Sequence, residues 1–165
     1  MKIFARFCQF ALVAALGFWL WTVFFPSAEQ VIQKRLGKVA ALLSFDSKEG
    51  PVAKIANVED LARYFSSDIE IIVDTPVQAK QTIRGREELT QLLRGARMML
   101  GGLDVKFVDV TVKLAPSKTD ATVSMTGRAI VAGDRDPFIQ ELKFILRKID
   151  GAWLIVRIET VRTLT

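Results

Sequence analysis

Histidine is absent from this chain of 165 residues, and cysteine and tyrosine occur once each, as Cys8 and Tyr64. Without histidine, the serine-histidine and cysteine-histidine arrangements of nucleophilic catalysis are excluded. Zinc sites built on cysteine or histidine are excluded too, and one cysteine allows no internal disulfide. Any general acid or base must therefore be an aspartate, a glutamate, a lysine or Tyr64, and we expect no metal and no cofactor.

Charge is absent from residues 7–25. At ~1.5 Å per residue, a helix of this stretch is roughly 28 Å long, close to the ~30 Å hydrocarbon core of a bilayer. A cleaved signal peptide is the alternative, but its apolar core usually has only ~7–15 residues, and cleavage after Ala28 would put Pro26 in an unfavourable position. The stretch also ends in aromatic residues, which are typical of a retained span. The sequence therefore favours a signal anchor over residues 1–25, followed by one domain over 26–165.

The orientation of this span rests on the basic residues on its two sides. Lys2 and Arg6 precede it, and Lys34, Arg35 and Lys38 follow it, so the positive-inside comparison is nearly balanced. A six-residue tail with two charges beside the free amine is hard to translocate. We therefore expect a single-pass membrane protein with its N-terminus inside and its domain outside the cytoplasm.

The net charge of +5 gives little support to nucleic-acid binding. Residues 26–165 carry 21 Lys and Arg against 18 Asp and Glu, and these charges are interspersed. The basic clusters with interleaved aromatics that single-stranded nucleic acid requires do not occur. We expect a solvated, mildly basic surface and no nucleic-acid partner, with Lys34, Arg35 and Lys38 near anionic headgroups.

Hydrophobic periodicity predicts helices first and long strands last. An apolar stripe with three-and-four spacing predicts a helix over 29–45, Asn57 is typical of the N-cap of a second helix, and Gly85 precedes a third that ends at Gly101. Alternation predicts a short hairpin between 69–73 and 77–83 and then four strands, over 103–114, 121–132, 138–149 and 153–164. These elements indicate an α+β domain with helices on one face of a curved antiparallel sheet.

Two local signals refine the predicted sheet. In the first long strand the alternation slips by one residue between Phe107 and Val108, which predicts a bulge that bends the strand. Asp150-Gly151 is typical of a two-residue hairpin turn, because both positions need positive φ.

Three stretches, Leu61–Ile71, Ile83–Leu89 and Phe144–Val156, resemble the nuclear transport factor 2-like superfamily, which includes SnoaL-like cyclases and ketosteroid isomerases. The resemblance covers about residues 29–163 and implies a cone-like fold with a pocket between sheet and helices, and a homodimer through the open sheet face. These motifs specify a scaffold rather than a reaction.

The resemblance also implies a position for a catalytic base, beside the proline that ends the first hairpin strand. Here that proline is Pro76, the residue before it is Thr75, and the nearest acid is displaced to Asp74. Because strand neighbours point to opposite faces, Asp74 is a weak candidate base, and a turn carboxylate that caps local amides is the simpler interpretation.

Other candidate site residues lie on the later strands and on the second helix. Glu159 and Arg157 are two residues apart, so alternation places them on one face with Trp153 and Ile155, either as a polar pocket site or as an ordinary cross-strand contact. The candidate ligand-pocket residues are Tyr64, Arg128, Trp153 and Arg157, and the weak catalytic candidates are Asp74 and Glu159.

Two functions compete on this sequence. The first is a membrane-tethered, non-enzymatic binding or assembly module that presents its sheet face or pocket to a protein partner or a small apolar ligand. The second is a pocket enzyme of the isomerase, dehydratase or cyclase type, in which burial raises the pKa of a carboxylate base. The missing catalytic residues favour the first.

Overall fold

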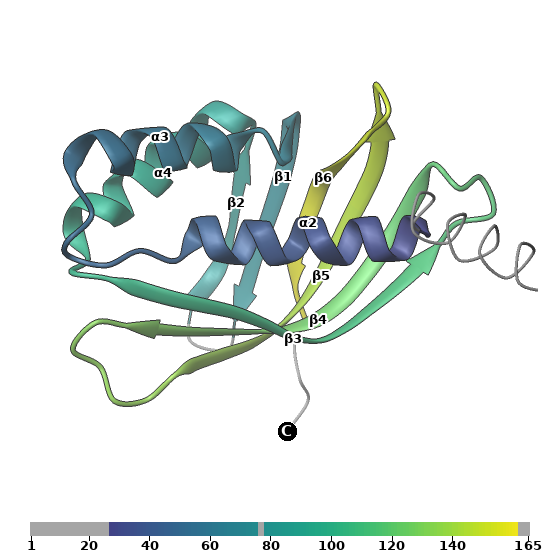
Figure 1. Cartoon of the computed structure of the whole chain (residues 1–165). Helices are drawn as coiled ribbons and strands as arrows, with labels where there is room; N and C mark the ends of the chain where they lie inside the picture. The colour runs from purple at the N-terminus through teal and green to yellow at the C-terminus, as the bar shows by residue number, and fades with distance from the viewer. Residues whose placement is uncertain (1–26, 76–77, 162–165) are drawn as a thin grey trace, which may run out of the picture. The chain divides into compact units, whose positions relative to one another are not determined.

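The computed structural model describes residues 27–75 and 78–161, and the predicted anchor and Pro76 lie outside them. The contacts set Ile32–Thr165 apart as one compact unit. Figure 1 labels the described elements, which follow the predicted order of helix, helix, hairpin, helix and four strands. They are α2 (Ala28–Leu43), α3 (Pro51–Ala62), β1 (Phe65–Thr75), β2 (Gln78–Arg84), α4 (Arg86–Met99), β3 (Leu103–Leu114), β4 (Asp120–Val131), β5 (Phe138–Ile149) and β6 (Ala152–Thr160).

No helix within residues 27–75 and 78–161 is long and apolar enough to cross a bilayer. The first described helix, α2, begins with a capping box. The Ser27 amide donates to Gln30 Oε1 at 3.2 Å, and the Gln30 amide donates to Ser27 Oγ at 3.3 Å. This exchange satisfies two amides that the first helical turn leaves without partners.

The second helix begins earlier than the sequence predicts. Asn57 was the predicted N-cap, but α3 begins at Pro51, with Gly50 as its N-cap. Proline fits the first helical position because its missing amide has no partner there and its φ is already helical. The Asn57 side chain instead donates to Glu49, in the segment before the helix.

The six strands form one sheet in the order β2-β1-β6-β5-β4-β3. All neighbouring pairs are antiparallel except β1 and β6, which are parallel. The sheet is therefore mixed, and the prediction of an antiparallel sheet is wrong at this pair. Alternation reports which face a side chain occupies but not the direction of the neighbouring strand.

Bulges in β3 and β6 are among the features that curve the sheet. The predicted slip in β3 is confirmed: the β3–β4 register shifts between Val108 and Thr111, and Asp109 has a φ of 55°. A second shift lies between β5 and β6, where Ile145 faces Arg157 and Leu146 faces Ile155, so Val156 is the extra residue. The predicted hairpin turn at Asp150-Gly151 is also confirmed, with φ of 50° and 81°.

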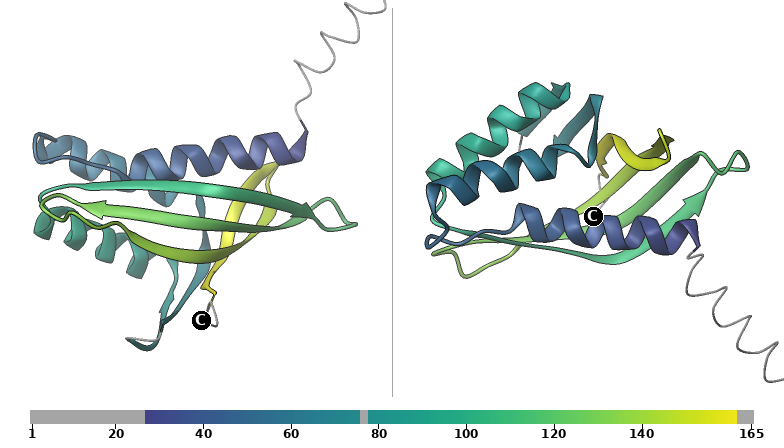
Figure 2. Two further views of the ribbon diagram at one scale, coloured as in Figure 1. Left: turned by 90° about the horizontal axis from the view of Figure 1, so that it is seen from below. Right: turned by 45° about the horizontal axis from the view of Figure 1, so that its top comes forward.

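The core lies between the concave face of the sheet and the helices (Figure 2). The predicted stripe of α2 is buried there, and the Phe107 and Phe144 rings pack edge to face with centroids 5.8 Å apart. Buried apolar residues from every helix and from strands β1, β4, β5 and β6 complete it, among them Leu36, Leu61, Ile69, Leu89, Val123, Leu146, Trp153 and Ile155.

The Gly85-Arg86 motif has a structural role. Gly85 has a φ of 85°, which costs other residues backbone strain, and its amide donates to the Ile69 carbonyl at 2.8 Å. The Arg86 guanidinium donates from Nε and Nη2 to the Phe65 carbonyl at 3.0 and 2.6 Å. The motif thus fixes the start of α4 against β1.

Arg97 joins three parts of the helical layer. Its side chain is 4% exposed and donates to the Glu49 carboxylate at 2.6 Å and to the Leu42 carbonyl. Its guanidinium also lies 4.8 Å from the centroid of the Phe45 ring. The end of α4 is thereby held against the end of α2 and the segment that leads into α3.

Replacement of Arg97 by alanine should destabilise residues 27–165 by about 3 kcal/mol, because Glu49 would keep a nearly buried charge without its partner. Urea unfolding measures this loss, and the Tm should fall by roughly 10 °C. Arg97→Lys should recover only part of it, since an ammonium lacks the guanidinium fork. Arg94→Ala is the matched control, because its ion pair with Glu59 is half-exposed and contributes ~0.5 kcal/mol or less. Equal losses for Arg94→Ala and Arg97→Ala would contradict the assignment.

A candidate anion-binding groove

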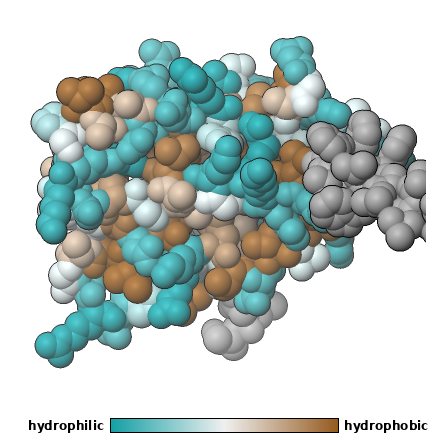
Figure 3. All heavy atoms as spheres, in the orientation of Figure 1, coloured by the Kyte–Doolittle hydropathy of each residue, from teal (hydrophilic) through white to brown (hydrophobic). Residues whose placement is uncertain are grey.

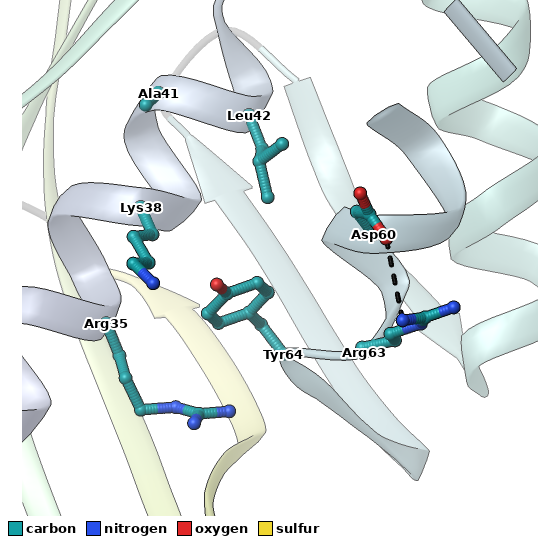
Figure 4. Close-up of a pocket in the computed structure, with 7 residues that line it drawn as sticks. All are labelled: Arg35, Lys38, Ala41, Leu42, Asp60, Arg63 and Tyr64. Carbon is teal, nitrogen blue, oxygen red and sulfur yellow. Dashed lines mark ion pairs between the residues drawn. The ribbon is translucent and has the colours of Figure 1, made fainter. Parts of the chain in front are cut away.

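A groove with a volume of about 530 Å³ lies between α2 and the end of α3 (Figure 4). Its position follows from the orientation of α2, which buries one stripe against the sheet and turns its flank toward α3. The groove is lined by Arg35, Lys38, Ala41, Leu42, Asp60, Arg63 and Tyr64.

Arg35 is fixed in this groove by the only tyrosine of the chain. Its guanidinium carbon lies 4.9 Å from the centroid of the Tyr64 ring. A cation over an aromatic face gains about 0.5–1 kcal/mol at an exposed site and about 2 when desolvated. Arg35 Nε is inaccessible to water and has no hydrogen-bond partner among the described residues. A buried donor without a partner is costly, so the position of Arg35 depends on its stack with Tyr64.

Two further cations line the groove. Lys38 follows Arg35 by three residues, so the two lie on the same side of α2. Arg63 forms an ion pair with Asp60 at 3.7 Å, and both side chains are more than half exposed. Such exposed pairs contribute little and exchange readily. Three cations therefore face one weakly held carboxylate, and the groove carries excess positive charge.

The side chains that line the groove favour anion binding. Guanidinium, ammonium and phenol groups are donors for carboxylate or phosphate oxygens. The methyl groups of Ala41 and Leu42 add a small apolar wall. Asp60, the only carboxylate in the lining, is exposed and paired with Arg63. No cluster of three or more candidate metal-ligating side chains occurs in the described part of the chain.

Of the sequence-predicted site residues, only Tyr64 lines this groove. Asp74 is half-buried near the end of β1, about 33 Å along an extended strand from Tyr64 at ~3.3 Å per residue. Its amide donates to Thr160 Oγ1 at 2.7 Å, and the Thr160 hydroxyl donates back to the Asp74 carbonyl at 3.0 Å. These bonds join the ends of β1 and β6.

Arg157 and Glu159 do not share a face with Trp153 and Ile155, and that expectation is wrong. The bulge at Val156 reverses the alternation within β6. Trp153 is consequently 4% exposed in the core, whereas Arg157 and Glu159 lie on the convex face. Arg128 is exposed on that face too, opposite Lys106 and Ile139.

Five side chains on the convex face form a chain of ion pairs across four strands, with charges of alternating sign. Arg157 is at its centre and contacts Glu159 at 2.5 Å and Glu70 at 2.9 Å. Glu159 also faces Lys143 at 3.7 Å, and Glu70 faces Arg84 at 3.5 Å. Glu159 is thus held as a paired carboxylate among cations, as in a cross-strand contact.

Sequence reasoning did not assign Arg35 and Lys38 to a site with Tyr64. It placed them near headgroups because they are basic residues close to the apolar stretch. The spacing of three between Arg35 and Lys38 does indicate that both lie on the same flank of the buried α2 stripe. It does not indicate that Tyr64 lies against this flank, because that depends on how α3 packs against α2.

No protein-family model and no curated protein sequence matches the chain. Solved structures do match. A proposed scytalone dehydratase from Novosphingobium aromaticivorans is 21% identical, with 82% of this chain and 83% of that chain covered and a TM-score of 0.60. A protein of unknown function with a cystatin-like fold from Nostoc punctiforme is 19% identical, with coverage of 84% and 96% and a TM-score of 0.58. A proposed dehydratase of the nuclear transport factor 2-like family from Streptomyces avermitilis is 11% identical, with coverage of 82% and 96% and a TM-score of 0.62.

The chain has the nuclear transport factor 2-like fold. The expected α+β architecture with three helices on a curved sheet is confirmed. At these identities the likeness concerns the fold, and activities named for the other proteins belong to them.

The stack of Arg35 on Tyr64 should be measurable as a coupling energy. Arg35→Gln, Tyr64→Leu and the double variant form a double-mutant cycle, in which we expect a coupling of about 0.5–1 kcal/mol from urea unfolding of residues 27–165. The control cycle combines Arg63→Gln with Tyr64→Leu. The Arg63 side chain is 79% exposed, and among the described residues it is Arg35 that stacks on the Tyr64 ring. A coupling near zero in the first cycle would show that Arg35 is not held by the ring in solution.

Proposed function

We propose that this protein is a non-catalytic binding module, held at a membrane by residues 7–25, that binds an anionic ligand in the groove between α2 and α3. The observation that carries the proposal is the Arg35 guanidinium stacked on Tyr64, with Lys38 and Arg63 in the same lining. The ligand class that fits is a carboxylate, phosphate or sulfonate with a small apolar part against Ala41 and Leu42.

The arrangement of carboxylates supports binding over catalysis. A general base needs a carboxylate within reach of a substrate in a mostly apolar cavity. In the groove that group would have to be Asp60, which is 56% exposed and faces Arg63. Glu159 is paired with two cations on the opposite face of the sheet. Neither carboxylate lies in the mostly apolar cavity that a carboxylate base requires.

The membrane part of the proposal rests on the sequence of residues 7–25. A tether would raise the local concentration of the module near other membrane-bound molecules, so modest affinity would be sufficient for function. An anionic ligand presented at a membrane is compatible with the three cations of the groove.

A pair of matched probes tests the groove. Anilinonaphthalene sulfonate is anionic and N-phenylnaphthylamine is its neutral counterpart, so their comparison isolates charge. We expect residues 27–165 to bind the anionic probe preferentially. Arg35→Gln and Lys38→Gln should each weaken its binding by about tenfold in a fluorescence titration, as for loss of a charged hydrogen bond. Added salt should weaken it further.

Lys113→Gln serves as the control, because Lys113 is exposed on the edge strand β3. Its replacement lowers the net charge by the same amount as Arg35→Gln or Lys38→Gln. Circular dichroism confirms that each variant is folded. Similar binding of both probes, or similar affinities for the Arg35→Gln and Lys113→Gln variants, would rule out the groove as an anion site.

The alternative is a pocket enzyme of the isomerase, dehydratase or cyclase type. Two of the compared structures are described as proposed dehydratases, which supports this alternative at the level of the fold. Asp74 would be its base. Elimination of water from a β-hydroxy carbonyl compound by residues 27–165, lost in Asp74→Asn and retained in Arg35→Gln, would replace the binding proposal with this one.

A further inference from the structure

Exposed apolar side chains are concentrated on two helices. Nine large hydrophobic residues are exposed among the described residues, and five of them lie on α3 and α4. Met99, Met98 and Val52 protrude most, at 87%, 84% and 82% exposed. We call these five residues the α3–α4 patch: Val52, Ile55, Leu92, Met98 and Met99. Figure 3 shows apolar surface at the corner of the molecule that α3 occupies.

The patch borders a second groove of about 530 Å³, lined by Pro51, Lys54, Ile55, Arg94, Arg97 and Met98. Polar contacts join the two helices that form it. Arg94 of α4 pairs with Glu59 of α3, and Lys54 Nζ donates to the Arg97 carbonyl at 3.4 Å. The apolar side chains are therefore exposed on two helices that contact each other.

The charged side chains that line this groove are all basic. Glu59 and Glu49 neutralise Arg94 and Arg97, which leaves Lys54 as the uncompensated charge. The same sign prevails over the whole helical layer. Residues 28–63 and 86–99 carry nine Lys and Arg against seven Asp and Glu, whereas residues 64–85 and 100–161 carry eleven of each. The positive charge of the described domain thus belongs to its helices, so the helical side is attracted to anionic surfaces.

We propose that the α3–α4 patch docks on the surface of an anionic lipid bilayer. Aliphatic and thioether side chains would enter the boundary between headgroups and acyl chains, and the basic residues around them would face lipid phosphates. The protruding shape of the patch fits this occupant, because a bilayer accepts projecting side chains whereas a protein partner must supply complementary pockets. The charge-free stretch of residues 7–25 is an independent reason to expect a bilayer nearby. This docking is separate from ligand binding in the α2–α3 groove.

The test uses the full chain reconstituted in lipid vesicles. Because Cys8 is the only cysteine, a Cys8→Ser background allows one fluorescent label at Met98→Cys in the patch, or at Ser124→Cys on the convex sheet face as the control. Brominated lipids quench fluorophores that reach the acyl chains. In vesicles of phosphatidylglycerol and phosphatidylcholine, we expect quenching at position 98 to exceed that at 124 by about threefold, and the excess to shrink in phosphatidylcholine alone.

Two exposed substitutions made together, Val52→Gln and Met99→Gln, should abolish most of the excess quenching at position 98. Circular dichroism should show an unchanged fold, because both side chains are more than four-fifths exposed. Equal quenching at positions 98 and 124, or absence of quenching at 98, would overturn the proposal. Pyrene excimers between labels at position 98 at low protein-to-lipid ratio would overturn it too, since they would show a second copy of the chain covering the patch.

Discussion

The buried ion pair of Arg97 with Glu49 sets the arrangement on which both candidate surfaces depend. Arg97 comes from the end of α4, Leu42 from the end of α2, and Glu49 from the segment before α3, so one guanidinium connects all three helices. The orientation of α3 relative to α2 determines the first groove, and its orientation relative to α4 determines the second. A charge this deeply buried adds little net stability compared with an apolar group, but it tolerates few alternative arrangements.

A second constraint is the division of side chains between the two faces of the sheet. The extra residue at Val156 turns Trp153 and Ile155 toward the core and Arg157 and Glu159 toward the convex face. Trp153 and Ile155 thereby join the apolar core. Arg157 and Glu159 join a chain of ion pairs that also includes Glu70, Arg84 and Lys143. This part of the convex face is therefore polar and internally paired. The groove between α2 and α3 instead holds more cations than carboxylates.

This distribution of charge gives the two sides of the molecule different chemistry. The sheet is electrically balanced, and the helices carry the surplus of cations together with most of the exposed apolar side chains. A stacked Arg35 with Lys38 and Arg63 beside it fits a discrete anionic group, whereas a protruding apolar patch fits an extended surface. Both features lie on the helical side of the fold and suit anionic partners. The sequence motifs that specify the scaffold explain neither the Arg35 stack nor the exposed apolar side chains.

The sequence by itself determined the order and type of the elements, the bulge in β3 and the hairpin turn at Asp150-Gly151. These features follow from hydrophobic periodicity and from the backbone preferences of glycine and aspartate, which act over a few residues. It also excluded histidine chemistry and an internal disulfide, since both depend on composition alone. Only the tertiary structure decided that β1 runs parallel to β6, that Val156 separates Arg157 from Trp153, and that Tyr64 lies under Arg35. Each depends on contacts between segments distant in the chain, and a shift of one residue in register moves a side chain to the opposite face.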